Sequence, residues 1–327
     1  MKKILLLQTD YFGYQDKIRE SFERKGFYVD WMDDRPSNNV ISKGLIRINP
    51  KLQKKKIDKY FYQKIFPKAV KEQYDFVIVI LGQSFSSKMF KNLKKEMKHS
   101  KFILYLWDSV KNFPQFVELS KGFDVTYSFD GDDCKNFGFN FMPLFFSNEV
   151  TRLAESFPDN QIKYDVSFVG TIKKGKIPFL EQIRLQFSKK FNRIYFYYYL
   201  QSKLVFFFNK ITNKEFKGKH MNDFSYKKML YEDTLRLSME SNIVLDVPMA
   251  NQKGLSMRTF ETLAMKRKLI TTNKSILNYE FYNPKNIYVF EKKIDFSNVF
   301  FNSKYDDKNQ DKLNYYQIDN WTDRLIQ

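Results

Sequence analysis

The sequence contains very little cysteine and histidine. Of its 327 residues, one is a cysteine, Cys134, and two are histidines, His99 and His220. A single cysteine excludes an internal disulfide framework and a zinc site built on several cysteines, and it fits a reducing compartment. No Gly-x-Gly-x-x-Gly or Gly-x-x-x-x-Gly-Lys-Ser/Thr element occurs. This absence argues against a dinucleotide oxidoreductase and a P-loop nucleotidase.

Long hydrophobic runs are missing as well. The first residues, MKKILLLQTD, stop being apolar at Gln8, which predicts a buried strand rather than a signal peptide. The aromatic run from Ile194 to Phe208 is interrupted by Gln201, Ser202 and Lys203. It is shorter than the roughly 20 apolar residues that a membrane-spanning helix needs. We therefore predict a cytoplasmic chain that nowhere crosses a membrane.

The chain carries an excess of positive charge. Its 56 lysines and arginines against 37 acidic residues give a formal net charge of +19. Such a field attracts anions, including nucleotide diphosphates, nucleic acid and the acidic face of a membrane, and charge alone does not choose among them. The 43% of apolar residues provides for real cores, and the length favours two domains of roughly 150 residues each.

Short, unalternated apolar runs predict strands that are buried on both faces of a parallel sheet. Helical patterns such as Gln15 to Lys25, Ile57 to Gln73, Tyr226 to Met239 and Met257 to Lys266 separate them, which predicts doubly wound α/β domains. The runs form two series: Ile4 to Leu7, Phe76 to Leu81, Phe102 to Leu106 and Val125 to Phe129, then Val166 to Val169, Ile194 to Tyr199, Ile243 to Leu245, Leu269 to Thr271 and Ile287 to Phe290.

A polar stretch between Ser147 and Lys163 predicts the boundary between the two series. We therefore expect an N-terminal domain over 1–150 and a C-terminal domain over 163–310. The remaining segment, 311–327, is expected to pack back on the N-terminal domain.

Ligands of open α/β sheets bind outside the carboxyl ends of the strands, which directs attention to the loops there. The richest stretch runs from Ser241 to Asn273 and predicts strand, loop, helix and strand. Ser256 is a plausible helix N-cap, whose backbone N–H groups can hold phosphate oxygens. Arg258 and Glu261 are expected on an outward face, where they suit a diphosphate and a ribose diol. The alternative is an ordinary helical ion pair, worth a few tenths of a kcal/mol.

The segment KGLSMRTFETLAMKRKLITTN, followed by YNPKNIYVF, resembles the donor-site signature of GT-B glycosyltransferases. The specific resemblance is to the bacterial family of capsular, exopolysaccharide and lipopolysaccharide biosynthesis proteins. YDVSFVGTIKKGK and DFSYKKMLYEDTLRLSMESNIVLDV are similar to preceding segments of that family, so the resemblance covers most of residues 164–290. It implies two Rossmann-like domains facing across a cleft, with a nucleotide-sugar in the C-terminal domain and the acceptor in the N-terminal one.

The resemblance also implies roles for individual residues. Glu261 matches the carboxylate that binds the ribose, and Arg258 matches a diphosphate contact. The other implied donor contacts are Gly170, Thr171, Lys173, Lys174 and Lys176 in the loop that approaches the phosphates, and Gly254, Leu255, Ser256 and Thr259 at the start of the signature helix. For the three lysines of that loop, the alternative is that they are simply solvated surface residues.

One departure from the wider fold bears on mechanism. Many retaining members carry a glutamate eight residues before the ribose-binding one, and Lys253 stands there in this chain. This favours an inverting transfer, which needs a base for the acceptor hydroxyl. Asp108, beside Trp107 and after the strand FILYLW, is the first candidate, and Asp10 is the second. The alternative role for Asp108 is capping of the next segment, and both histidines are expected at the surface.

The sequence FDGDD contains an Asp-x-Asp pair, Asp130 and Asp132, of a kind that can hold a divalent metal. The alternative is a strand-to-helix turn in which Asp130 and Gly131 make the bend and Asp132 caps the helix. We favour the turn and predict neither a metal nor another cofactor.

Two functions remain open on the sequence. The first is transfer of a nucleotide-activated sugar to a glycan, expected to be lipid-linked, with peripheral contact to an anionic membrane surface. The second is a non-catalytic nucleic-acid-binding protein that uses Lys51 to Lys59 and Lys88 to Lys101 with interleaved aromatic residues. We prefer the first and expect no nucleic-acid partner, because such a binder has no need of the Gly-Leu-Ser-Met-Arg-x-x-Glu arrangement after a buried strand.

Overall fold

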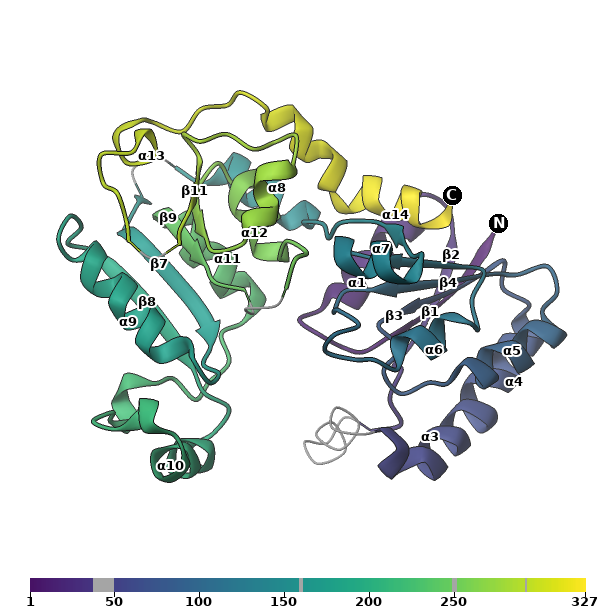
Figure 1. Cartoon of the computed structure of the whole chain (residues 1–327). Helices are drawn as coiled ribbons and strands as arrows, with labels where there is room; N and C mark the ends of the chain where they lie inside the picture. Colours follow the sequence, from purple (N-terminus) through teal and green to yellow (C-terminus); the bar gives the residue numbers. More distant parts are fainter. Residues whose placement is uncertain (38–49, 159–160, 249–251, 292) are drawn as a thin grey trace. The chain divides into compact units, whose positions relative to one another are not determined.

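A computed structural model describes residues 1–37, 50–158, 161–248, 252–291 and 293–327. The chain divides into two compact units (Figure 1). The first comprises Met1–Phe145, Gln252–Gly254 and Tyr316–Gln327, and the second comprises Phe146–Asn251 and Leu255–Tyr315. Each unit is built on one parallel sheet, so the prediction of two Rossmann-like α/β domains is confirmed.

The first unit has a six-stranded sheet of order β2-β1-β3-β4-β5-β6, in which all neighbours are parallel. All four apolar runs predicted as strands in this half form strands. The sequence does not predict β2, in which only Val29 is buried, or β6, which has two residues. The strands are β1 (Lys3–Gln8), β2 (Tyr28–Met32), β3 (Phe76–Ile80), β4 (Lys101–Leu106), β5 (Val125–Ser128) and β6 (Asn140–Phe141).

Helices cover both faces of this sheet. Leu5, Val77 and Leu104 point to a core that is closed by one group of helices. A π-helical turn at Phe61–Ile65 joins the first two of that group. The group consists of α3 (Lys54–Tyr60), α4 (Phe66–Glu72), α5 (Ser87–Glu96) and α6 (Phe116–Ser120), while α1 (Tyr14–Arg24) and α14 (Ile318–Ile326) cover the other face, and α7 (Gly131–Phe137) follows β5.

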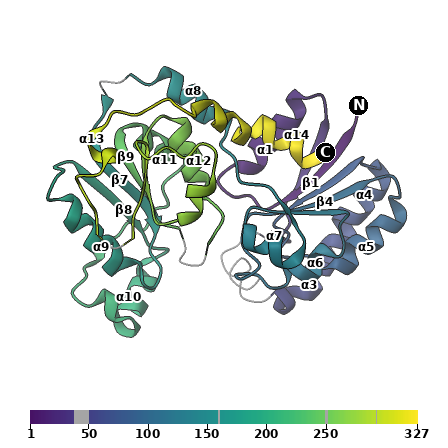
Figure 2. The same cartoon turned by 45° about the horizontal axis from the view of Figure 1, so that its top comes forward.

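The C-terminal helix α14 completes the first unit, lying beside α1 in both views (Figures 1 and 2). Trp321 is fully buried, with its ring 4.8 Å from that of Tyr105 and 4.6 Å from that of Phe145. Its indole N–H donates to the Pro143 carbonyl at 3.1 Å. The Ser21 hydroxyl donates to the Asp319 carboxylate at 2.6 Å, which fastens α14 to α1.

The second unit repeats this plan with the strand order β11-β10-β9-β7-β8, again all parallel. The apolar side chains of α9 pack on one face of the sheet, while α11 and α12 lie on the other. The strands are β7 (Tyr164–Thr171), β8 (Ile194–Tyr199), β9 (Ser241–Asp246), β10 (Lys268–Thr271) and β11 (Ile287–Val289), and the helices are α8 (Asn148–Ser156), α9 (Lys176–Phe187), α10 (Lys203–Thr212), α11 (Tyr231–Met239), α12 (Met257–Ala264) and α13 (Val299–Asn302).

The strand expected over Ile194–Tyr199 is confirmed as β8, while one expected helix of this unit begins later than the sequence predicts. The run from Ile194 to Phe208 divides into β8 and α10, because Ser202 interrupts it and caps the helix by accepting from the Val205 N–H at 3.2 Å. The helix expected from Tyr226 begins only at Tyr231.

Each sheet has one place where the strand order reverses. In the first unit β1 lies between β2 and β3, and in the second β7 lies between β8 and β9. Connections leave this place toward opposite faces, so the loops at the carboxyl ends of the two diverging strands open a crevice where ligands of such folds bind. The candidate ligand-binding loops therefore follow β1 and β3 in one unit, and β7 and β9 in the other.

Within the residues that the structure describes, no helix combines the length and the apolar character that spanning a bilayer requires.

We predict that Trp321→Ala destabilises the protein by about 3–5 kcal/mol, because it removes a fully buried aromatic side chain and its hydrogen bond. Urea unfolding measures the change. Asp323→Asn on the same helix is the control, since the side chain of Asp323 is 51% exposed and its ion pair with Lys25 is worth at most about 1 kcal/mol. Equal shifts in the two variants would contradict the anchoring role of α14.

Candidate functional site

The carboxyl end of β9 and the start of α12 are tied together by a buried aspartate, Asp246. It is the last residue of β9, and its side chain accepts a hydrogen bond from the Ser256 hydroxyl at 2.5 Å and from the Thr259 hydroxyl at 3.2 Å. Ser256 in turn caps α12 by accepting from the Thr259 N–H at 3.3 Å, as the sequence predicts. Asp246 therefore fixes where the N–H groups of the first turn of α12 point.

Three cationic side chains gather at this place. Lys176 opens α9 after the β7 loop and donates to the Val247 carbonyl at 2.9 Å. Arg258, in the first turn of α12, donates to the Val169 carbonyl in β7. Burial, Lys173 and Arg258 lower the pKa of Lys176, while Asp246 raises it. The three cations interact through space, so an anion bound among them would relieve their mutual repulsion.

The loop between β7 and α9 approaches this place closely because of a glycine. Gly170 is the last but one residue of β7, and a Cβ atom there would come within 2.4 Å of the Phe168 ring. Only glycine lets the strand end run so close to that ring. Thr171 follows as the last strand residue, and the loop then leads through Lys173 to Lys176. The structure thus assembles the expected phosphate-approaching loop and the helix start at one edge of the sheet.

Glu261 differs from expectation, because it does not face outward. Its side chain is buried, with 5% of its surface exposed, and it accepts a hydrogen bond from the Tyr231 hydroxyl at 2.8 Å. The same hydroxyl lies 3.1 Å from the hydroxyl of Ser147. Burial first, and then the Glu261 charge, raise the pKa of Tyr231, so the phenol stays protonated. The helix period alone misplaced Glu261, because the facing residue, Tyr231, is supplied by another helix.

The other residues expected at the donor site lie behind its surface. Leu255 and Thr259 are buried, with 2% and 1% of their surface exposed, and Thr259 turns toward Asp246. Gly254 belongs to the short piece Gln252–Gly254 that groups with the first unit. Residues 249–251 of the same expected loop lie outside the described residues.

In the first unit the two candidate bases follow β1 and β4, which are separated in the sheet by β3. Asp10 is exposed and accepts from the Gln15 side-chain amide at 2.9 Å. Asp108 is half-buried and accepts from the Ser109 N–H at 2.9 Å and from Asn112 Nδ2 at 2.7 Å. The rings of Tyr11 and Trp107 lie 6.4 Å apart, which brings the two loops side by side. The bonds of Asp108 are those of a local cap, the alternative that the sequence left open.

A buried polar cluster that the sequence reading missed lies at the strand reversal of this unit. Asp34, after β2, is fully buried, and it accepts from the Thr9 hydroxyl and lies 3.8 Å from Arg35 Nε. Burial and the neighbouring Asp33 raise the pKa of Asp34 to about 7, against the opposing effects of Thr9 and Arg35. Within the described chain, Asp34 Oδ2 and both polar atoms of the Gln8 amide are buried without hydrogen-bond partners.

Backbone geometry marks the same reversal at the end of β3. Leu81 and Gly82 follow the strand with φ angles of +72° and +64°, in the left-handed region that a leucine rarely adopts. Ser84, three residues on, is 5% exposed, and its hydroxyl makes no hydrogen bond within the described residues. Strained backbone and unpaired polar atoms cluster at functional sites, so this edge is the candidate site of the first unit.

The Asp130 and Asp132 pair forms a helix cap. Asp130 is the N-cap of α7, and its side chain accepts from the Asp132 N–H at 3.0 Å. The expected roles are thus exchanged, since Asp130 rather than Asp132 does the capping. Among the described residues, no group of three or more His, Cys, Asp or Glu side chains is placed to hold a metal ion.

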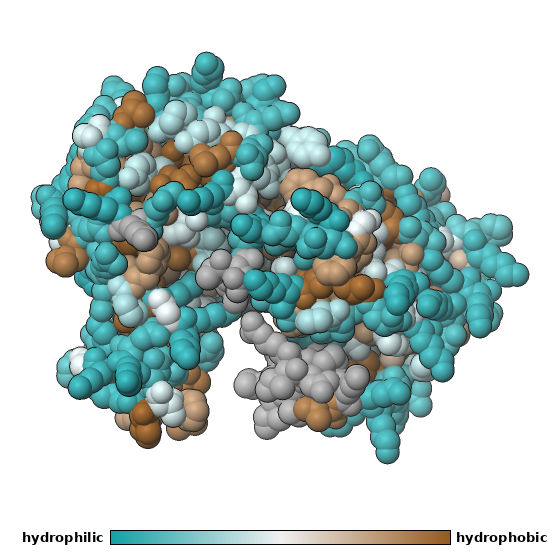
Figure 3. All heavy atoms as spheres, viewed as in Figure 1, coloured by the Kyte–Doolittle hydropathy of each residue, from teal (hydrophilic) through white to brown (hydrophobic). Residues whose placement is uncertain are grey.

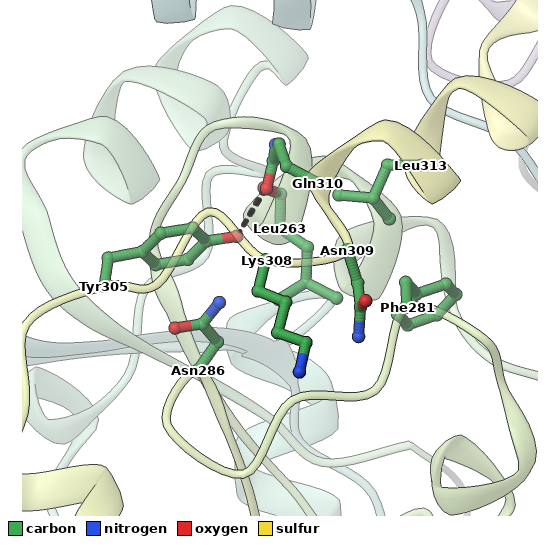
Figure 4. A pocket seen from close by; sticks show the side chains of 8 residues that line it. All are labelled: Leu263, Phe281, Asn286, Tyr305, Lys308, Asn309, Gln310 and Leu313. Carbon is green, nitrogen blue, oxygen red and sulfur yellow. Dashed lines mark hydrogen bonds between the residues drawn. The ribbon is translucent and has the colours of Figure 1, made fainter.

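A small pocket lies at the other end of α12, away from Ser256 (Figure 4). The Tyr305 hydroxyl donates to the Leu263 carbonyl at 3.1 Å and to Gln310 Oε1 at 2.9 Å across it. Burial raises the pKa of Tyr305, so its hydroxyl remains a donor. The pocket belongs to the attachment of the segment after α13 to α12, and it brings no candidate site residue together.

No protein-family model and no curated protein sequence matches the chain. Solved structures match over the full length. The lipopolysaccharide outer core galactosyltransferase WaaB, in its apo form, has a TM-score of 0.62 at 11% identity, covering 100% of this chain and 99% of its own. Anabaena Alr3699/HepE in complex with UDP-glucose has a TM-score of 0.58 at 9% identity, covering 100% and 98%.

An epimerase shares the architecture. The UDP-GlcNAc 2-epimerase of Methanocaldococcus jannaschii, in complex with UDP-GlcNAc and UDP, has a TM-score of 0.53 at 13% identity and covers 94% of each chain. These likenesses show that the chain has a GT-B-like fold with two Rossmann-like domains. At such low identity they show the fold alone.

The buried Asp34 predicts a pH-dependent stability. The pKa of Asp34 lies near 7 in the folded protein, above its value in the unfolded chain. Between about pH 4 and pH 7 the folded protein therefore holds a proton that the unfolded chain has lost. The free energy of unfolding consequently falls as the pH rises through this range. Relative to Asp34→Asn, the wild type should lose roughly 2–3 kcal/mol of unfolding free energy between about pH 5 and pH 8. Urea unfolding of both proteins at the two pH values measures this difference. Asp132→Asn replaces an exposed aspartate of the same unit and is the control: its unfolding free energy should change with pH as that of the wild type does.

Proposed function

We propose that this protein is a nucleotide-sugar-dependent glycosyltransferase that acts in the synthesis of a bacterial surface polysaccharide, such as a capsule, an exopolysaccharide or lipopolysaccharide. The observation that carries the proposal is the convergence of Lys173, Lys176 and Arg258 with the N-terminus of α12 at the strand reversal of the second sheet. Cations and unpaired helix N–H groups together suit a diphosphate. The resemblance of the surrounding segments to a donor-site signature supports the same reading.

On this proposal the second unit holds the donor. Lys176 and Arg258 neutralise the diphosphate, and the first turn of α12, set by Ser256 and Asp246, donates backbone N–H groups to it. Glu261 accepts from the ribose hydroxyls. Its carboxylate offers about four acceptor positions, and Tyr231 uses one of them while fixing the orientation of the group. Tyr231 and Asp246 are therefore positioning residues for the two ligand-facing groups.

The first unit supplies the acceptor side. Inversion requires a base that takes the acceptor hydroxyl proton while the hydroxyl oxygen attacks the anomeric carbon and the nucleoside diphosphate leaves. We assign this role to Asp108 ahead of Asp10. Trp107, half-buried beside Asp108, offers an apolar ring face to a sugar. The leaving diphosphate is stabilised by Lys176, Arg258 and the helix N-terminus, so the proposed transfer needs no metal ion.

The acceptor is proposed to be lipid-linked, and the enzyme to reach it from the cytoplasmic face of a membrane. The net charge of +19 favours contact with an anionic surface, where each lysine or arginine contributes about 1 kcal/mol. Nucleic acid is the alternative polyanion. Binding of nucleic acid to a basic surface does not require cations, a capped helix start and a buried carboxylate to lie together at one strand reversal.

We predict that Arg258→Met and Glu261→Gln each weaken UDP binding by roughly 10-fold or more, because each loses a charged hydrogen-bond partner worth about 1.5–3 kcal/mol. Glu261→Gln keeps the side-chain size, which matters since Glu261 is buried, and Arg258→Met keeps an unbranched apolar stem without the charge. Calorimetric titration with UDP measures the affinity, and the melting temperature without UDP checks the fold.

Lys189→Met is the matched control, because Lys189 is an exposed lysine of the same unit at the far end of α9 and its loss changes the net charge by the same amount as Arg258→Met. It should leave the affinity unchanged. Unaltered UDP binding in both site variants would refute the donor-site assignment.

A second prediction concerns the base. Asp108→Asn keeps the size of the side chain and removes proton acceptance, so turnover should fall by about 10²–10⁴-fold while UDP affinity stays the same. Donor hydrolysis can be followed until the acceptor is known, and EDTA should not change the rate. Asp10→Asn is the comparison. A lower melting temperature with only a modest kinetic loss in Asp108→Asn would show that Asp108 acts as a cap and would move the assignment to Asp10.

A further inference from the structure

Helix α10 presents an apolar ridge to solvent. Leu204, Phe207, Phe208 and Ile211 have 80%, 53%, 67% and 87% of their surface exposed. Their spacing of three, four and seven residues places them on one side of the helix. In Figure 3 brown side chains cluster at the end of the second unit where Figure 1 places α10, with teal residues around them. We call these four residues the apolar ridge.

The opposite side of α10 is anchored firmly. Phe206 is buried, and its ring lies 6.0 Å from that of Phe216 and 5.7 Å from that of Phe224, two rings that stack on each other at 5.3 Å. Ser202 caps the start of the helix. The ridge is therefore held outward by a packed aromatic cluster, and the exposure of its side chains is built into the fold.

Positive charge is concentrated in the segment that carries the ridge. Residues 203–228 contain seven lysines and two acidic residues, Glu215 and Asp223. Lys210 donates to the Lys219 carbonyl at 2.5 Å, and Lys219 pairs with Glu181. The other five lysines, Lys203, Lys214, Lys217, Lys227 and Lys228, are exposed. An apolar stripe bordered by cations is complementary to a surface with anionic headgroups over an apolar interior.

We propose that the apolar ridge of α10 is a membrane-docking surface, whose leucine, isoleucine and phenylalanine side chains enter the headgroup and acyl boundary of an anionic bilayer. The neighbouring lysines contact the lipid phosphates. Soluble proteins rarely leave a contiguous patch of large apolar side chains uncovered, and the lysine border selects an anionic lipid surface as its occupant. The ridge thus adds a specific insertion site to general attraction by the net charge.

This inference rests on the proposed function in one respect: a lipid-linked acceptor is the reason why the protein would contact a membrane. Docking is measured without donor or acceptor, and UDP binding is measured without lipid. The two therefore fail separately: a protein that binds vesicles but no UDP would refute the proposed function alone, and one that binds UDP but no vesicles would refute the docking surface alone.

The test is co-sedimentation of the full chain with vesicles of phosphatidylcholine mixed with phosphatidylserine. The wild type should bind, and Phe208→Glu with Ile211→Glu should lower the partition coefficient at least tenfold. Both side chains are exposed, so the fold should be retained, with unchanged melting temperature and UDP affinity. Leu185→Glu, at a leucine of the same unit that is 67% exposed on α9, is the matched control and should bind as the wild type does after allowance for one added charge.

Insertion has its own readout. Phe208→Trp should show emission that shifts to the blue and is quenched by brominated lipids, beyond the signal of the three native tryptophans in the wild type. Quenching no greater than in the wild type, or vesicle binding equally reduced by Leu185→Glu, would overturn the proposal. So would a dimer in analytical ultracentrifugation that Phe208→Glu with Ile211→Glu dissociates, because the ridge would then be covered by a second copy of the chain.

Discussion

A parallel sheet has to be covered on both faces, and most of this architecture follows from that constraint. The central strands β1, β3 and β4 are buried on both sides, so the chain must place crossover helices on both faces, which it does by reversing the strand order once. The change of direction leaves one place in each sheet where two loops diverge. Lys176 and Arg258 interact because their loops follow β7 and β9 at such a place, although they are far apart in the sequence.

The two strand reversals carry opposite electrostatics. In the second unit burial and the charges of Lys173 and Arg258 lower the pKa of Lys176, Asp246 opposes them, and the excess of positive charge favours a bound anion. In the first unit a buried carboxyl, Asp34, has a raised pKa and unpaired polar neighbours, which favours groups that exchange protons or hydrogen bonds. The proposed transfer, with a diphosphate on one substrate and a hydroxyl on the other, would use both environments.

The sequence predicts the fold well because its signals are local. Runs such as Ile4 to Leu7 and Phe102 to Leu106 are apolar throughout, and Ser256 starts its helix with the hydrogen bond expected of an N-cap. The candidate site is predicted less well, because its contacts are distant. Glu261 was expected outward, yet Tyr231 covers it from another helix, and Asp34 lies in a turn whose burial no periodicity reveals.

The contact of Trp321 with Pro143 closes a loop of 178 residues, and this sets an order of events during synthesis. Until Trp321 has been made, Tyr105 and Phe145 lack the ring that packs on both of them, and α1 alone covers that face of the first sheet. At about 5–20 residues per second, the nascent chain waits roughly ten to forty seconds in that state. The second unit can therefore fold while the first is still incomplete, and the growing chain must keep an aromatic sheet face from aggregating in the meantime.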